Sequence, residues 1–257
     1  MINEPFASGN SIVHRLDPRF RTFFAVLLSI EVALLKDFSA MGFALLVAFF
    51  LAASARLNIR EVMKRLSSIF GFLLLLWIVI PLTYEGTPAW QAGWLTWTRE
   101  GIHLSAQISL KSTAILMIFM ALVATMTLST LGRALKRLSM PGKLVHLLLM
   151  TYRYIFVIGQ EYQRLYTAMR IRGFRPSTSL HSYKTYAYLF GMLFVRASKR
   201  AERVNQAMIL RGFNGRFYSL DDFQPSYKNW IFAGTMMMIF TGILLMENGL
   251  LWPMKPF

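Results

Sequence analysis

The segment AMRIRGF at residues 168–174 returns 39 residues later as AMILRGF at residues 207–213. In both copies an arginine stands four residues after the alanine and directly before a glycine. Residues spaced by four share one face of an α-helix, and a glycine after the last turn favours the left-handed backbone that ends a helix. The two segments therefore predict two helices that end in the same way.

The repeated residues form a set of candidate contact positions. A further arginine precedes each alanine by four, so each copy carries Arg, Ala and Arg at i, i+4 and i+8. For one copy alone, the arginine needs no functional explanation, because a basic residue in the last turn interacts favourably with the helix dipole and the free carbonyl groups. Two matching copies favour two equivalent sockets on a partner. The candidate positions are Arg164, Ala168, Met169, Arg172, Gly173 and Phe174 in the first copy, and Arg203, Ala207, Met208, Arg211, Gly212 and Phe213 in the second.

Hydrophobicity and charge occupy different parts of this chain, which is 55% hydrophobic yet has a formal net charge of +16. Residues 129–229 hold 17 of the 28 Lys and Arg but only four of the acids. Apolar runs close to the length needed to cross about 30 Å of hydrocarbon lie at 20–35, 38–55, 66–84, 102–128 and 230–251. The sequence therefore predicts an all-α polytopic membrane protein with about five transmembrane helices. Its predicted parts are a four-span region 1–128, a cytoplasmic region 129–229, and a last span with an external tail 230–257.

Basic residues predict the orientation of the spans, because cytoplasmic connections are rich in Lys and Arg. Arg15, Arg19 and Arg21 precede or begin the first span, and Arg56 to Arg65 separate the second from the third. The alternate connections carry few charges. We expect a cytoplasmic N terminus and an external C terminus, with Asp17 capping the first helix.

The cytoplasmic region has the pattern of amphipathic helices. A short helix is expected at 131–138, followed by long helices at 143–172 and 181–211. Each long helix begins apolar and becomes charged before it ends in a repeat. The apolar stretch 144–158 is short for a span, so we place it at the membrane boundary, with a re-entrant or sixth crossing as the alternative.

Two charges lie inside predicted spans, Glu31 in the first and Lys111 in the fourth. Intramembrane charges are costly and often functional, so the two are a possible ion pair or a contact with another subunit. Snorkelling toward the external interface is the structural alternative.

Several kinds of chemistry find no support in the sequence. Cysteine is absent, and the four histidines are scattered without metal-ligand spacing. A phosphate-binding Gly-x-x-x-x-Gly-Lys-Ser/Thr segment is missing as well. We therefore expect no enzyme activity, no metal site and no cofactor in this chain.

The twin Ala-x-x-x-Arg-Gly-Phe segments, the run from Glu202 to Gly215, and Leu16 to Arg19 resemble one known family. It is the transmembrane T component of energy-coupling factor (ECF) transporters, cobalt/nickel type (CbiQ). The resemblance covers essentially the whole chain. It implies that the two long cytoplasmic helices are crossed coupling helices and that Arg172 and Arg211 insert into grooves on two ATP-binding-cassette ATPase subunits.

The same resemblance implies the partners and the location. ATP and Mg²⁺ would be bound by the ATPase subunits, and the metal, cobalt or nickel, would be selected by a small substrate-binding membrane subunit. The chain would lie in a bacterial or archaeal plasma membrane and bind no nucleic acid. The alternatives from the residues alone are a membrane enzyme or lipid-binding protein acting on anionic substrates, and a membrane-anchored nucleic-acid binder. The thin supply of acids and the position of the aromatic residues disfavour them.

Overall fold

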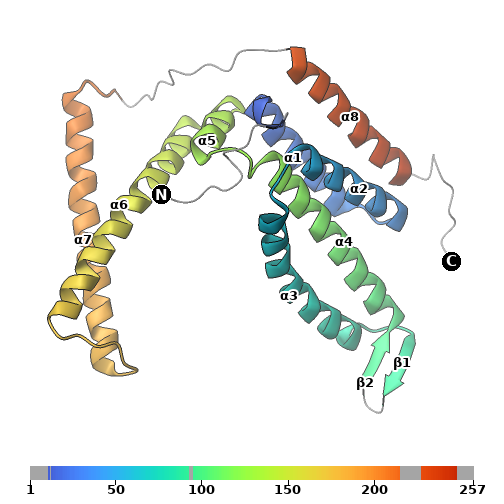
Figure 1. Cartoon of the computed structure of the whole chain (residues 1–257), viewed down its shortest axis with the longest axis horizontal. Coiled ribbons are helices and arrows are strands. Elements are labelled where there is room, and N and C mark those ends of the chain that lie inside the picture. Colours follow the sequence, from blue (N-terminus) through green and yellow to red (C-terminus); the bar gives the residue numbers. More distant parts are fainter. Residues whose placement is uncertain (1–10, 12, 93–94, 215–226, 248–257) are drawn as a thin grey trace. The chain divides into compact units, whose positions relative to one another are not determined.

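The structure is a computed structural model, and it describes residues 11, 13–92, 95–214 and 227–247. It is all-α apart from one short hairpin, as the sequence predicts (Figure 1). The elements are η1 (Val13–Arg15), α1 (Pro18–Leu34), α2 (Phe38–Ser54), α3 (Ile59–Thr83), β1 (Pro88–Ala92), β2 (Leu95–Thr98), α4 (Arg99–Leu122), α5 (Leu128–Arg137), α6 (Gly142–Ile171), α7 (Leu180–Leu210) and α8 (Tyr227–Glu247).

The chain divides into two compact units. The helical bundle contains α1 to α5, the hairpin and α8, whereas residues 139–221 form a second unit with α6 and α7. The short helix α5, which follows the fourth predicted span, packs on α1 and belongs to the bundle.

Small residues hold the centre of the bundle together. Ala40, Ala44 and Ala48 recur every four residues along α2 and are essentially inaccessible to solvent. This spacing puts them on one helix face, and α2 packs closely on α4, which contributes Ala114 and Ile118 to the same core. Without bulky side chains the two backbones approach closely, which strengthens helix packing in lipid.

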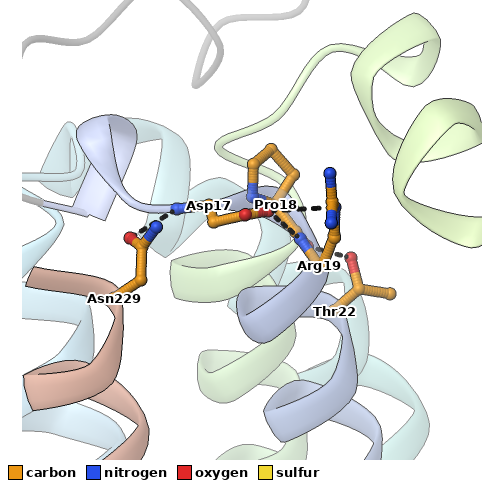
Figure 2. A network of polar contacts seen from close by, with 5 residues as sticks. All are labelled: Asp17, Pro18, Arg19, Thr22 and Asn229. Carbon is orange, nitrogen blue, oxygen red and sulfur yellow. Dashed lines mark hydrogen bonds and ion pairs between the residues drawn. The ribbon is translucent and has the colours of Figure 1, made fainter. Parts of the chain in front are cut away.

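Helix α8 is joined to both ends of α1. At the start of α1, Asn229 Oδ1 accepts a hydrogen bond from the backbone N–H of Asp17 at 3.1 Å (Figure 2). Beyond its other end, the carboxylate of Glu247 accepts from the N–H groups of Lys36 and Asp37, at 2.9 and 3.3 Å. The two helices therefore run in the same direction.

The predicted start of α1 is confirmed. Asp17 is the N-cap, and its side chain accepts from the N–H of Arg19 at 2.9 Å. Pro18 follows in the first helical position, where its missing N–H costs no hydrogen bond. Thr22 donates to the carbonyl oxygen of Pro18 at 2.8 Å, which completes the network in Figure 2.

Helix α4 runs opposite to α1. Near its start, Gln107 donates to the carbonyl oxygen of Lys36 at 3.2 Å. Just after its end, Thr125 accepts from the guanidinium of Arg21, which is 1% exposed. Helices α1, α2, α3 and α4 thus alternate in direction, and α8 runs parallel to α1.

The hairpin between α3 and α4 is a feature that the sequence analysis missed. Strands β1 and β2 pair antiparallel, with Trp90 opposite Trp97. Thr98 ends β2 and begins α4, because its hydroxyl accepts from the N–H of Gly101 at 3.3 Å. The hydroxyl also donates to the carbonyl oxygen of Tyr84, just beyond α3, at 3.0 Å. The hairpin therefore fixes the adjoining ends of α3 and α4 together.

The fourth predicted span, 102–128, is wrong at its C-terminal end. Helix α4 stops at Leu122, and a new helix begins at Leu128 behind the N-cap Thr127. The break arises because the Thr127 hydroxyl accepts from the N–H of Thr130 and so favours a helix start over continuation.

Four described helices are long and apolar enough to cross a membrane, namely α3, α4, α6 and α8. Helix α2 is a shorter apolar helix of 17 residues, and α1 has the same length. At 1.5 Å per residue both are about 25 Å long, near the lower limit for a span. Helix α6 contains the apolar stretch 144–158, for which the sequence offered a further crossing as the alternative.

Candidate functional site

Helix α6 ends in a Schellman motif built around Gly173. The N–H of Gly173 donates to the carbonyl oxygen of Arg170 at 3.0 Å, and that of Phe174 to Met169 at 3.2 Å. Gly173 has a φ of +85°, a conformation that a side chain would disfavour. Arg172 is therefore fixed as the C-cap residue of the helix.

Helix α7 ends in the same way, 39 residues further on. The N–H of Gly212 donates to Ile209 at 2.9 Å, and that of Phe213 to Met208 at 3.0 Å. The φ of Gly212 is +80°, and Arg211 is the C-cap residue. The sequence repeat is thus a structural repeat that presents two arginines in equivalent backbone positions.

The side chains around the two arginines also match in exposure. Arg172 and Arg211 are exposed, as are Ala168 and Ala207, whereas the repeated Met and Phe residues are partly buried. Exposed donors in a planar fork suit carboxylates or carbonyl oxygens on another chain.

An apolar residue precedes each arginine, and sequence reasoning missed both. Ile171 is 81% exposed and Leu210 is 88% exposed, more than any other large hydrophobic residue that the structure describes. Exposed apolar groups beside a polar anchor are typical of protein contact sites. The repeat does not reveal them as a matching pair, because the first copy has Ile and the second has Leu, although both residues are aliphatic.

The two helices cross and contact each other within their own unit (Figure 1). Tyr162 of α6 stacks on Phe190 of α7, with ring centroids 6.4 Å apart. Phe174 meets Tyr186 edge to face at 5.5 Å. Glu161 and Arg196 form an ion pair between the helices. These contacts fix the positions of the two helix ends relative to each other.

The two arginine-bearing ends lie far apart. Phe174, next to the first end, contacts His181 and Tyr186 in the first turns of α7. Arg211 is at the other end of this helix, which has 31 residues. At 1.5 Å per residue the separation is about 45 Å. One small pocket cannot hold both arginines, so they suit two separate sockets.

The outer arginines of the repeat have different surroundings. Arg164 lies 3.7 Å from the carboxylate of Glu161, one turn away on the same helix. Arg203 lines a basic cavity between α6 and α7. Neither is at a helix end.

The possible intramembrane pair does not form. Lys111 Nζ donates to the carbonyl oxygen of Ala33 at 3.1 Å. Glu31 is 5% exposed, and neither of its carboxylate oxygens has a hydrogen-bond partner in the described structure. The lysine therefore satisfies a backbone carbonyl near the end of α1, which differs from the ion pair that was one interpretation of these two charges.

Within the described residues, three or more His, Asp and Glu side chains do not gather into a potential metal site. The long apolar helices define a polytopic all-α membrane protein.

The chain belongs to the CbiQ family: the sequence model of that family, described as cobalt transport protein, matches residues 9–220. This confirms the resemblance carried by the twin segments.

Relatives span most of the chain. The energy-coupling factor transporter transmembrane protein EcfT of Exiguobacterium sibiricum is 30% identical and covers 80% of this chain and 83% of its own length. EcfT of Listeria innocua is 29% identical, with 98% of this chain and 97% of the relative covered. An uncharacterized protein of Methanocaldococcus jannaschii is 27% identical over 88% of this chain. The EcfT names describe transmembrane components of a transporter, in agreement with the expectation that this chain is not an enzyme.

Proposed function

We propose that this chain is the coupling subunit of an ECF-type ABC importer. It receives the ATP-driven motion of two ATPase subunits and passes it to a separate substrate-binding membrane subunit. The proposal is supported by membership of the CbiQ family and by the EcfT relatives. ATP and Mg²⁺ belong to the ATPase subunits, and this chain contributes binding surfaces and a mechanical connection.

One observation carries the assignment of the ATPase contacts. Two helices close with the same hydrogen bonds and present Arg172 and Arg211 in the same backbone position. Their separation of about 45 Å suits one groove on each of two subunits. Ala168 and Ala207 allow a close approach of each helix, while Ile171 and Leu210 add apolar contact that excludes water around the arginine.

The crossed helices transmit motion because they contact each other near the middle. The ion pair of Glu161 with Arg196 and the stack of Tyr162 on Phe190 resist a change in crossing angle. A displacement at either arginine is therefore passed to the other helix rather than absorbed by bending at the crossing.

We assign the transported substrate to a metal ion, cobalt or nickel, selected by the separate membrane subunit. The support is the description of the matching family as cobalt transport protein. The lack of a ligand cluster among the described residues agrees with selection elsewhere.

We assign the N terminus to the cytoplasm and the C terminus to the outside of the plasma membrane. Parallel α1 and α8 put the start of α1 and the end of α8 on opposite sides of the bundle. Arg15, Arg19 and the cluster Arg56 to Arg65 lie at the side where α1 begins, which favours that side as cytoplasmic.

The test is recovery of partners with the solubilised chain from its native membrane. The double variant Arg172→Glu, Arg211→Glu should lose the ATPase subunits and retain its place in the membrane. The double variant Lys143→Glu, Arg153→Glu makes the same charge change on exposed residues in the first half of α6, away from the two arginine-bearing ends, and it should behave like the wild type. Full ATPase recovery with the first variant would contradict the proposal.

A further inference from the structure

A basic cavity lies between α6 and α7, beside the point where the helices cross. Its volume is about 290 Å³. Four cationic side chains line it, Arg196, Lys199, Arg200 and Arg203, against the single carboxylate of Glu161. Arg196 already pairs with that carboxylate. The cavity therefore has an excess of positive charge, which suits an anion with several acceptor oxygens, such as a phosphate group.

A larger apolar groove continues directly from this cavity. It has a volume of about 570 Å³, and its lining includes Leu147, Ile155 and Phe194. These three side chains are all exposed, and Phe194 is 76% accessible. The volume is in the range of ligand-binding pockets.

The two spaces share three lining residues, Ile158, Ala197 and Arg200. Arg200 stands at the boundary, where an arginine can lay its stem along apolar surface and keep its guanidinium at the polar end. A ligand that occupies both spaces must have an anionic head and a long apolar part.

We infer that this composite site, the basic cavity and its adjoining groove, binds an anionic phospholipid. The phosphate lies among Lys199, Arg200 and Arg203, and an acyl chain follows the groove past Ile155 and Phe194. A purely apolar protein helix would fill the groove but would leave the cationic cavity without a matching charge. Clusters of basic residues beside an apolar helix face are typical of sites for anionic lipids. The inference is independent of the ATPase contacts, because it concerns the sides of the helices rather than their ends.

The experiment measures lipid binding to the full-length chain in detergent by native mass spectrometry. Phosphatidylglycerol and phosphatidylcholine with identical acyl chains are compared at equal concentrations. Phosphatidylglycerol should bind at least tenfold more tightly to the wild type. The double variant Lys199→Gln, Arg200→Gln should bind it about 30-fold more weakly. The control, Arg170→Gln with Lys184→Gln, removes two charges outside both spaces and should bind like the wild type.

A second variant tests the groove without changing charge. Ala201 lines the apolar groove, so Ala201→Trp should fill it and lower phosphatidylglycerol binding. Excess inorganic phosphate should leave the lipid bound, whereas displacement by phosphate would assign the cavity to a free anion. Equal binding of the two lipids to the wild type, or equal loss in the charge variant and its control, would overturn the inference. So would retention of tight lipid binding by Ala201→Trp, provided that circular dichroism shows native helix content.

Discussion

Gly173 and Gly212 adopt almost the same backbone conformation, with φ values of +85° and +80°, although 39 residues separate them. Each turns the chain away directly after an arginine. Neither would bring an added Cβ within 4 Å of another group, so any effect of alanine there comes from the backbone alone. Alanine substitution at these two positions therefore tests the backbone conformation of the helix ends without adding a steric clash.

We expect Gly173→Ala and Gly212→Ala to destabilise their helix ends by about 1–2 kcal/mol each, because left-handed backbone is costly for alanine. ATPase recovery should fall, as the arginine loses its fixed position. Gly159→Ala is the matched control: it lies inside α6 with no group within 4 Å of the added Cβ. Alanine favours helix there, so recovery should stay at the wild-type level. Amide hydrogen exchange at 168–174 and 207–213 measures the fraying directly, and equal protection in all variants would refute the mechanism.

The exposed aliphatic residues beside the arginines should contribute to partner binding. We expect Ile171→Ser and Leu210→Ser each to weaken binding of the ATPase subunits by about tenfold. The unfolding temperature of the free chain should not change, since both side chains are exposed. Tyr188→Ser removes an exposed apolar side chain elsewhere on α7 and serves as control. Titration of the purified ATPase subunits against the reconstituted chain measures the effect, and unchanged affinity would show that these side chains stay outside the contact.

The bond between Asn229 and Asp17 should stabilise the bundle. Asn229 is 5% exposed, so Asn229→Ala would leave the N–H of Asp17 without its partner. We expect a loss of about 1–3 kcal/mol, or a drop of several degrees in the unfolding temperature. The measurement is thermal unfolding in detergent. Asn205→Ala changes an exposed asparagine of α7 and should leave the temperature unaltered.

Glu31 should cost stability, because its buried carboxylate has no hydrogen-bond partner in the described structure. Glu31→Gln removes the ionisable group with little change in size, and we expect a higher unfolding temperature. Glu161→Gln should do the opposite, because it removes the ion pair with Arg196. Reduced stability of Glu31→Gln would show that the carboxylate has a stabilising partner in the assembled membrane.

Local patterns predicted the helices well because lipid demands long apolar runs and the twin glycines mark helix ends. The start of α1 at Asp17 and the ends of α6 and α7 within one residue of the expected positions follow from such signals. Contacts between segments that are distant along the chain have no local sequence pattern that would predict them. The joining of Asn229 to Asp17 and of Glu247 to Lys36 depends on how the helices pack. The hairpin formed by β1 and β2 was missed because tryptophan is frequent both at membrane surfaces and in β-strands, so its presence does not distinguish the two.

The candidate site was only partly visible in the sequence. Repetition identified Arg172 and Arg211, but the exposure of Ile171 and Leu210 emerged only from the structure. The ion pair of Glu31 with Lys111, one of the interpretations of these charges, does not form, because spacing along two helices does not fix their rotation. The side chain of Lys111 reaches the carbonyl oxygen of Ala33 instead.

The attachment of α8 to both ends of α1 has a mechanical consequence. Residues 139–221 are inserted between α5 and α8, and both of these helices pack on α1. Helix α1 therefore contacts both of the helices that flank the inserted residues along the chain. A shift of either flanking helix would alter the packing of the same third helix, α1.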